Sequence, residues 1–164
     1  MGGFLHFSYE ISNENRIVGY FSAINESTWE HLKMLITPSL IYLILEYILY
    51  GKYIDNFIII KTLSILVGIS TIVVLFYTYT GVLGTNYLIL DISTFGIGVF
   101  LEYYFSYKML QTNILANNYF NYIGIIFLIL IVLAQIIFTI NPPKIALFLD
   151  PVTNTYGIDK IFVK

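Results

Sequence analysis

The two histidines of this chain, together with nearby carboxylates, are the residues best suited to chemistry. His6 and Glu10 are four residues apart, so a helical N-terminus would present both side chains on one face. His31 belongs to a polar block, residues 25–33, that combines acidic, basic and aromatic side chains just before a long apolar run. Two imidazoles with one or two carboxylates are a common ligand set for zinc or manganese. We therefore consider His6, His31 and Glu26 as candidate ligands of a divalent metal ion.

A metal ion in such a site could support catalysis, because it activates bound water and a neighbouring carboxylate can accept the proton. The candidate catalytic residues are Glu30 and Asp91, and Glu10 is a further candidate base. The sequence contains no HExxH motif, no GxSxG motif and no glycine-rich phosphate loop. The first hypothesis for the function is therefore a binding or structural component. A metal-dependent membrane hydrolase is the alternative.

The same residues also have structural explanations. Ser27 and Glu30 have the spacing of a capping box, in which Ser27 accepts from the Glu30 amide and Glu30 reaches back to the Ser27 amide. Asn25 could cap the helix instead. Trp29 is expected to be an interfacial anchor, and Lys33 is expected to extend its charge to the membrane surface. The histidines could also hydrogen-bond carboxylates across helices, or bind a small polar ligand without chemistry.

The composition excludes an ordinary water-soluble domain. Of the 164 residues, 58% are hydrophobic and 11% are charged, and the mean hydropathy is +0.80, whereas soluble domains carry about 25% charged residues. The net charge of −2 and the scattered basic residues argue against binding to nucleic acid. Because the chain has no cysteine, it forms no disulfide and no thiolate metal site.

Four apolar segments are each long enough to cross a hydrocarbon core about 30 Å thick. Lipid cannot satisfy backbone hydrogen bonds, so these segments are expected to be helices, and their short connections predict antiparallel neighbours. Gly68, Gly96 and Gly98 predict close helix approach. We expect an all-α membrane bundle in a single domain over residues 1–164, with a short N-terminal apolar helix and a C-terminal tail that forms a turn or hairpin. The predicted spans are 33–50, 56–80, 86–110 and 119–140, and the tail is 144–164.

Charged residues inside the spans need partners, because an unpaired charge there costs roughly 2.5–3.5 kcal/mol on insertion scales. Lys61 lies at a depth compatible with Glu46 and Glu102, which predicts an intramembrane ion pair with one or both. Alternatively, Lys61 reaches the interface and the carboxylates are protonated or hydrated.

At the other face, Asp91 is expected one turn inside the membrane, where the N-terminal segment, the polar block and the tail converge. This convergence predicts a polar pocket. Its expected members are His6, Glu10, Asn25, Glu26, Glu30, His31, Asp91 and Asp150.

Basic residues are more numerous on the face that carries this pocket, so the pocket and the tail are expected to be cytoplasmic in a multi-pass protein of the cell membrane. The residues counted are Arg16, Lys33, Lys144, Lys160 and Lys164 on that face, against Lys52, Lys108 and Lys61 on the other.

Three motifs resemble a bacterial family of multi-pass membrane proteins, the domain of unknown function 6512. They are Leu5-His6-Phe7-x-Tyr9-Glu10, the segment from Ile17 to Lys33, of which the block at residues 25–33 is the most specific part, and Asp150-Pro151-Val152-Thr153-x-Thr155-Tyr156-Gly157-Ile158. The resemblance implies an integral membrane protein of unassigned function. Family members usually have a further hydrophobic segment before the first motif, so residues 1–10 are expected to be either a half-helix or the remainder of a truncated start. The expected partners are the lipid bilayer and a homo-oligomer or larger membrane assembly, since four spans rarely enclose a transport route.

Overall fold

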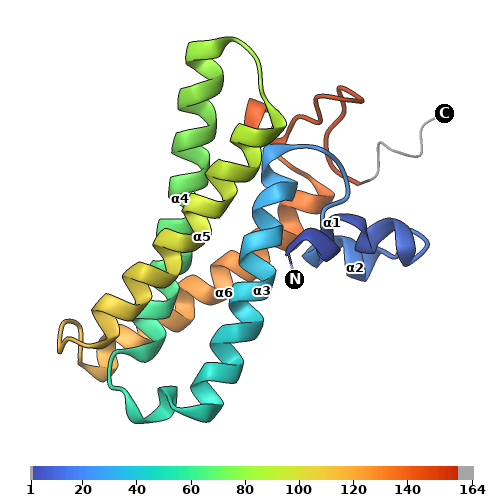
Figure 1. The fold of residues 1–164 in the computed structure, drawn as a ribbon. Helices are drawn as coiled ribbons and strands as arrows, with labels where there is room; N and C mark the ends of the chain where they lie inside the picture. Colours follow the sequence, from blue (N-terminus) through green and yellow to red (C-terminus); the bar gives the residue numbers. More distant parts are fainter. Residues whose placement is uncertain (1, 159–164) are drawn as a thin grey trace. The chain divides into compact units, whose positions relative to one another are not determined.

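The computed structural model describes residues 2–158, and within this range it contains helices but no strands (Figure 1). The all-α prediction is therefore confirmed. The elements are α1 (Gly2–Ile11), α2 (Arg16–Phe21), α3 (Thr28–Leu49), the short 3₁₀ helix η1 (Gly51–Tyr53), α4 (Phe57–Leu83), α5 (Leu88–Leu110), α6 (Asn118–Ile140) and the short 3₁₀ helix η2 (Ala146–Phe148).

Four of these helices, α3 to α6, are long and apolar enough to cross a membrane. They agree with the four predicted spans, except that α3 begins at Thr28 and not near residue 33. Lys33 therefore lies inside the helix. The segment before α3 also contains the short helix α2, which begins where the Asn15 side chain accepts a hydrogen bond from the Ile17 amide at 2.9 Å.

Residue contacts divide the chain into two compact units, which are described separately below. The first unit comprises Met1–Leu40 and Ile129–Lys164, and the second comprises Ile41–Leu128. The boundaries fall within α3 and α6. That the whole chain is one domain remains a prediction.

In the first unit, buried polar side chains connect α2, the first half of α3 and the second half of α6. Thr37 of α3 donates to the carbonyl of Phe21 at 2.7 Å, and Gln135 of α6 donates to the Thr37 hydroxyl at 3.2 Å. Hydrogen bonds of this kind join helices in membrane proteins, because apolar burial alone does not determine which helices pack together in lipid. A small apolar cluster of Tyr9 and Ile24 with Ile158 holds α1 against the same structure.

The tail folds back through a turn, as predicted. The Asp150 amide donates to the Thr155 carbonyl at 3.0 Å, and the Asp150 carboxylate accepts from the Val152 amide at 3.0 Å. An aspartate that bonds its own backbone two residues on is a common way to stabilise a turn. The end of the described chain is then joined to α6, because the Ile158 amide donates to the Thr139 carbonyl at 2.9 Å.

In the second unit, α4 and α5 run antiparallel and side by side (Figure 1). Gly98 permits this contact: a Cβ there would lie 3.0 Å from Ile72 Cδ1 and 3.2 Å from the Gly68 carbonyl oxygen. A Cβ at Gly96 would meet no atom within 4 Å, so the prediction that Gly96 permits close packing is wrong. Gly124 has that role on α6, where a Cβ would lie 2.9 Å from the Ile59 Cα.

Candidate metal centre

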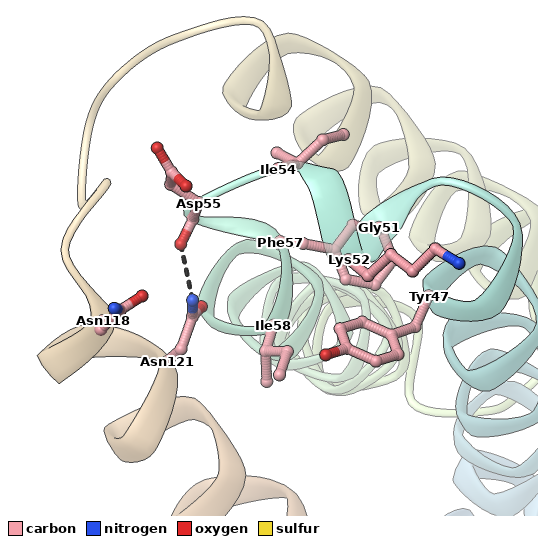
Figure 2. Close-up of a pocket in the computed structure, with 9 residues that line it drawn as sticks. All are labelled: Tyr47, Gly51, Lys52, Ile54, Asp55, Phe57, Ile58, Asn118 and Asn121. Carbon is pink, nitrogen blue, oxygen red and sulfur yellow. Dashed lines mark hydrogen bonds between the residues drawn. The ribbon is translucent and has the colours of Figure 1, made fainter.

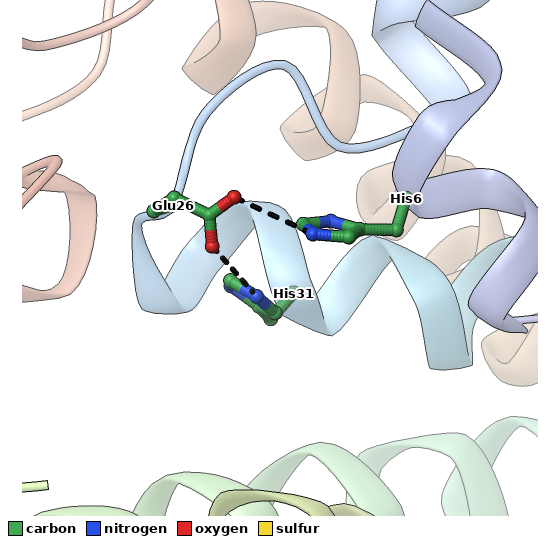
Figure 3. Close-up of side chains that lie close together, drawn as sticks. All are labelled: His6, Glu26 and His31. Carbon is green, nitrogen blue, oxygen red and sulfur yellow. Dashed lines mark ion pairs between the residues drawn. The ribbon is translucent and has the colours of Figure 1, made fainter. Parts of the chain in front are cut away.

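Three side chains from separate parts of the first unit meet at one point (Figure 3). His6 comes from α1, Glu26 from the loop before α3, and His31 from α3. His6 Nε2 lies 3.4 Å from Glu26 Oε1, and His31 Nε2 lies 3.5 Å from Glu26 Oε2. One ligand atom from each residue can be chosen so that all lie within 4.8 Å of one another. Among residues 2–158 this is a donor set able to hold a metal ion.

The hydrogen bonding of His31 determines which ring nitrogen faces Glu26. His31 Nδ1 lies 2.9 Å from the Ser27 carbonyl oxygen, which can only accept, so Nδ1 carries the proton. In the neutral ring, Nε2 then presents a lone pair toward the Glu26 carboxylate, which also only accepts. Two acceptors at this separation repel unless a positive charge lies between them. A metal ion between the two acceptors would remove this repulsion.

His6 completes the cluster from the opposite side. Its ring centroid lies 5.4 Å from that of His31, and its Nδ1 is buried without a hydrogen-bond partner among residues 2–158. The side chains of His6, Glu26 and His31 are 28%, 46% and 36% exposed, respectively. An ion from solution could therefore reach the cluster without unfolding.

Short-range capping holds the loop that carries Glu26. The Ser27 hydroxyl accepts from the Glu30 amide at 3.4 Å, which is one half of the predicted capping box. The other half is wrong, because the Ser27 amide donates to the Asn25 side chain at 2.9 Å and not to Glu30. Asn25 and Ser27 together therefore fix the backbone on both sides of Glu26.

The Glu30 carboxylate has partners outside the cluster of His6, Glu26 and His31. It accepts from the Ile24 amide at 3.1 Å and forms an ion pair with Lys33 at 2.7 Å. Lys33 also donates to the Gly19 carbonyl at 2.9 Å and to the Thr139 hydroxyl. The expected extension of Lys33 to the membrane surface is therefore wrong: the side chain is fully buried because its partners lie inside the unit.

The remaining residues of the predicted pocket lie in different surroundings. Glu10 is exposed on α1, and Asp150 stabilises the turn of the tail. Asp91 belongs to the second unit, where its carboxylate accepts from the Tyr79 hydroxyl and, at 3.3 Å, from the Asn86 side chain. Of the predicted pocket, His6, Glu26 and His31 form the metal-competent set.

A second polar cluster lies in the second unit. Lys61 of α4 forms an ion pair with Glu46 of α3, and its ammonium lies 5.5 Å from the ring centroid of Tyr103 and 5.9 Å from that of Phe57. Aromatic faces attract a desolvated cation. Glu102, the other predicted partner, is 4% exposed on α5 beside Tyr103.

Tyr50 follows Glu46 by one turn. Burial, and secondarily its hydrogen bond to the Glu46 carboxylate, raise the pKa of Tyr50 to about 12. The Tyr50 hydroxyl donates to the Glu46 carboxylate, so Glu46 has a second partner besides Lys61.

The second unit also contains a small pocket of about 140 Å³ that the sequence analysis missed (Figure 2). Asn121 crosses it: its amide nitrogen donates to the Asp55 carbonyl at 2.5 Å, and its oxygen accepts from the Ile59 amide at 3.2 Å. The asparagines near residues 55 and 120 are the feature of the sequence from which this pocket could have been predicted. The lining residues are Tyr47, Gly51, Lys52, Ile54, Asp55, Phe57, Ile58, Asn118 and Asn121.

Comparison with known proteins gives a family but no activity. No curated protein and no solved structure matches this chain. The sequence pattern of one family matches residues 1–158. The chain therefore belongs to DUF6512, a family of unknown function.

Proposed function

We propose that this chain is a multi-pass membrane protein that binds a divalent transition-metal ion through His6, Glu26 and His31. The observation that carries the proposal is the pair of acceptors formed by His31 Nε2 and the Glu26 carboxylate, 3.5 Å apart, with the His31 ring fixed by the Ser27 carbonyl. Metal-binding histidines commonly donate their second ring N–H to a backbone carbonyl, which orients the other nitrogen toward the ion.

The spacing of the donors supports the same proposal. Ligand atoms bound about 2.1 Å from one ion at tetrahedral angles lie about 3.4 Å apart. The histidine nitrogens lie 3.4 and 3.5 Å from the two different oxygens of Glu26, and one ligand atom from each residue lies within 4.8 Å of the others, so the side chains must move closer together to bind zinc. The same two-histidine, one-carboxylate set also suits manganese or ferrous iron.

Binding is favoured over hydrolysis as the function of this site. Three protein ligands would leave a position for water, as in catalytic zinc sites. A hydrolase also needs a free base near that water. Glu30, one of the candidate catalytic residues, is buried and already bound to Lys33 and the Ile24 amide. We therefore propose a metal-binding membrane component, and a metal-dependent hydrolase is the second candidate.

Metal analysis of the purified protein tests the proposal. Protein in detergent, loaded with Zn²⁺ or Mn²⁺ and then dialysed, should retain one equivalent of the preferred ion. His31→Ala and Glu26→Gln should each lower the affinity by more than the roughly 10–100-fold that loss of an outer-shell partner costs. Glu10→Gln is the matched control, because it removes the same charge from an exposed position on α1. Equal affinity in wild type and His31→Ala would exclude this site.

We also propose that the metal centre lies on the cytoplasmic face. The count of basic residues in the sequence supports this orientation, because the face with the centre has Arg16, Lys144, Lys160 and Lys164, against Lys52 and Lys108 on the other. Lys33 and Lys61 are left out of the count because each forms an ion pair, and Lys160 and Lys164, which lie outside the described residues, count by sequence alone. Because the chain has no native cysteine, a Lys144→Cys variant can be tested in whole cells with a membrane-impermeant thiol reagent. Labelling from outside would reverse the orientation.

A further inference from the structure

Helix α1 has an exposed apolar face and a buried face that carries His6. Phe4, Phe7 and Ile11 are 69%, 56% and 67% exposed, whereas Tyr9 on the other side is 4% exposed. The three exposed residues follow one another at intervals of three and four, so they form one stripe along the helix. An apolar stripe of this kind marks a surface that contacts another molecule or lipid.

The contacts of the first unit determine the level at which α1 lies. Through Glu26, His6 is linked to His31, and His31 precedes Lys33 by two residues, or about 3 Å along α3. Lys33 in turn contacts Thr139 near the end of α6. The metal centre and α1 are therefore within about one turn of the level at which α6 ends.

The exposed face of α6 is apolar up to that level. Leu133, Ile137 and Ile140 are 45%, 52% and 43% exposed on a helix that is apolar enough to cross a membrane. Asn141 and two prolines follow directly. Hydrocarbon that covers Ile140 would end close to the level of α1.

The direction of α1 differs from that of the spanning helix α3. In Figure 1, α1 lies beside α2 and extends away from the first half of α3, without running along it.

From these observations we infer that α1 is an interfacial helix, which inserts Phe4, Phe7 and Ile11 into the boundary between headgroups and acyl chains. The occupant of its apolar face is bilayer lipid, because the apolar surface of α6 reaches the same level within the first unit. The opposite face of α1 then presents His6 to Glu26 and His31 at the membrane surface. The ligand cluster would thus be held partly by lipid contact.

Spin labels on single cysteines test this inference. The chain has no native cysteine, so Phe7→Cys, Leu133→Cys and Lys144→Cys each give one labelled site. The variants are reconstituted in nanodiscs of phosphatidylcholine and phosphatidylglycerol without added metal. Collision rates with oxygen and with a water-soluble nickel chelate then report depth. Leu133 is the control for the lipid-exposed face of α6, and Lys144 is the exposed control in the loop.

The spin label at position 7 should collide more often with oxygen than with the chelate, as the label at position 133 does. Its spectrum should show no dipolar broadening. Accessibility to the chelate equal to that at Lys144 would overturn the inference. Broadening that is relieved by dilution with unlabelled protein would also overturn it, because the covering molecule would then be a second copy of the chain. Phe4→Cys gives the same readings where Phe7→Cys fails to fold. Since no metal is added, either failure leaves the proposed metal binding untouched.

Discussion

The ammonium of Lys33 lies 2.7 Å from the carboxylate of Glu30, and the two side chains are 0% and 3% exposed. Lys33 also binds the Gly19 carbonyl at the end of α2, and Glu30 binds the Ile24 amide in the loop toward Glu26. One buried ion pair therefore attaches α2 and the loop to the first turns of α3. The position of Glu26 beside both histidines depends on this attachment.

Removal of one member of this pair should destabilise the protein strongly. Lys33→Met leaves the Glu30 carboxylate buried without its cation, which costs about 3–5 kcal/mol in buried pairs. Adding Glu30→Gln removes the remaining charge, so the double variant should recover part of the loss. The measurement is the free energy of unfolding in mixed detergent micelles. The control is Lys144→Met, which removes an exposed lysine and should change stability by less than about 0.5 kcal/mol.

If the effects of Lys33→Met and Glu30→Gln add without coupling, the pair contributes nothing as a pair. A second outcome would also contradict the positional role: unchanged zinc affinity in a folded Lys33→Met variant would show that the Glu26 loop keeps its place without this lysine.

The pair formed by Lys61 and Glu46 should behave similarly in the second unit. Lys61→Met keeps an apolar chain between the rings of Phe57 and Tyr103 but leaves Glu46 without its cation. We expect a loss of about 3 kcal/mol, the cost of a charge in a span on insertion scales. Glu46→Gln should cost a similar amount, and the double variant should lose less than the sum of the two. Lys52→Met, which removes an exposed lysine just after α3, is the matched control.

Strict additivity of Lys61→Met and Glu46→Gln in the unfolding experiment would mean that the two charges do not interact. Hydrogen-exchange protection of the α4 backbone gives an independent reading, since loss of the pair should lower protection around residue 61 more than around residue 75.

The four long helices could be predicted because lipid solubility imposes a minimum length of apolar sequence, and that length is visible in any window of the chain. The charges of Glu46, Lys61, Asp91 and Glu102 inside the predicted spans were also visible, and charge cost alone predicts that they need partners. The burial of Lys33 in an ion pair could not be predicted in this way. Its partners include backbone carbonyls at Gly19 and Ser22, and every residue type presents a carbonyl, so no residue pattern marks them.

The candidate metal centre shows the same limit. The residue types predicted that His6, Glu26 and His31 could share an ion, but they did not predict the hydrogen-bond partner of Asp91. In the structure, Asp91 accepts a hydrogen bond from Tyr79 on the neighbouring helix of its own unit. Fifteen tyrosines in the sequence gave no reason to select this one. Depth in the membrane can be read from sequence, whereas rotation about a helix axis depends on packing.

Zinc binding at the proposed centre should release protons. Metal displaces any proton held between the histidine nitrogens and the Glu26 carboxylate, because only deprotonated groups coordinate. Affinity should therefore fall as the solution is acidified. Titration calorimetry in two buffers with different ionisation enthalpies measures the number of protons released, and the observed heat should differ between them. Glu10→Gln should release the same number as wild type. Equal heats in both buffers would show that no proton occupies the cluster before metal binds.

Gly98 and Gly96 form a matched pair that tests the packing of α4 against α5. Gly98→Ala places a methyl group 3.2 Å from the Gly68 carbonyl and against the side chain of Ile72, so the helices must separate, at a cost of about 1–3 kcal/mol. Gly96→Ala adds the same methyl where no atom lies within 4 Å, and the higher helix propensity of alanine should stabilise by up to about 1 kcal/mol. The two identical substitutions, two residues apart, are therefore expected to change the free energy of unfolding in opposite directions. Stabilisation by Gly98→Ala would mean that α5 does not approach α4 at this point.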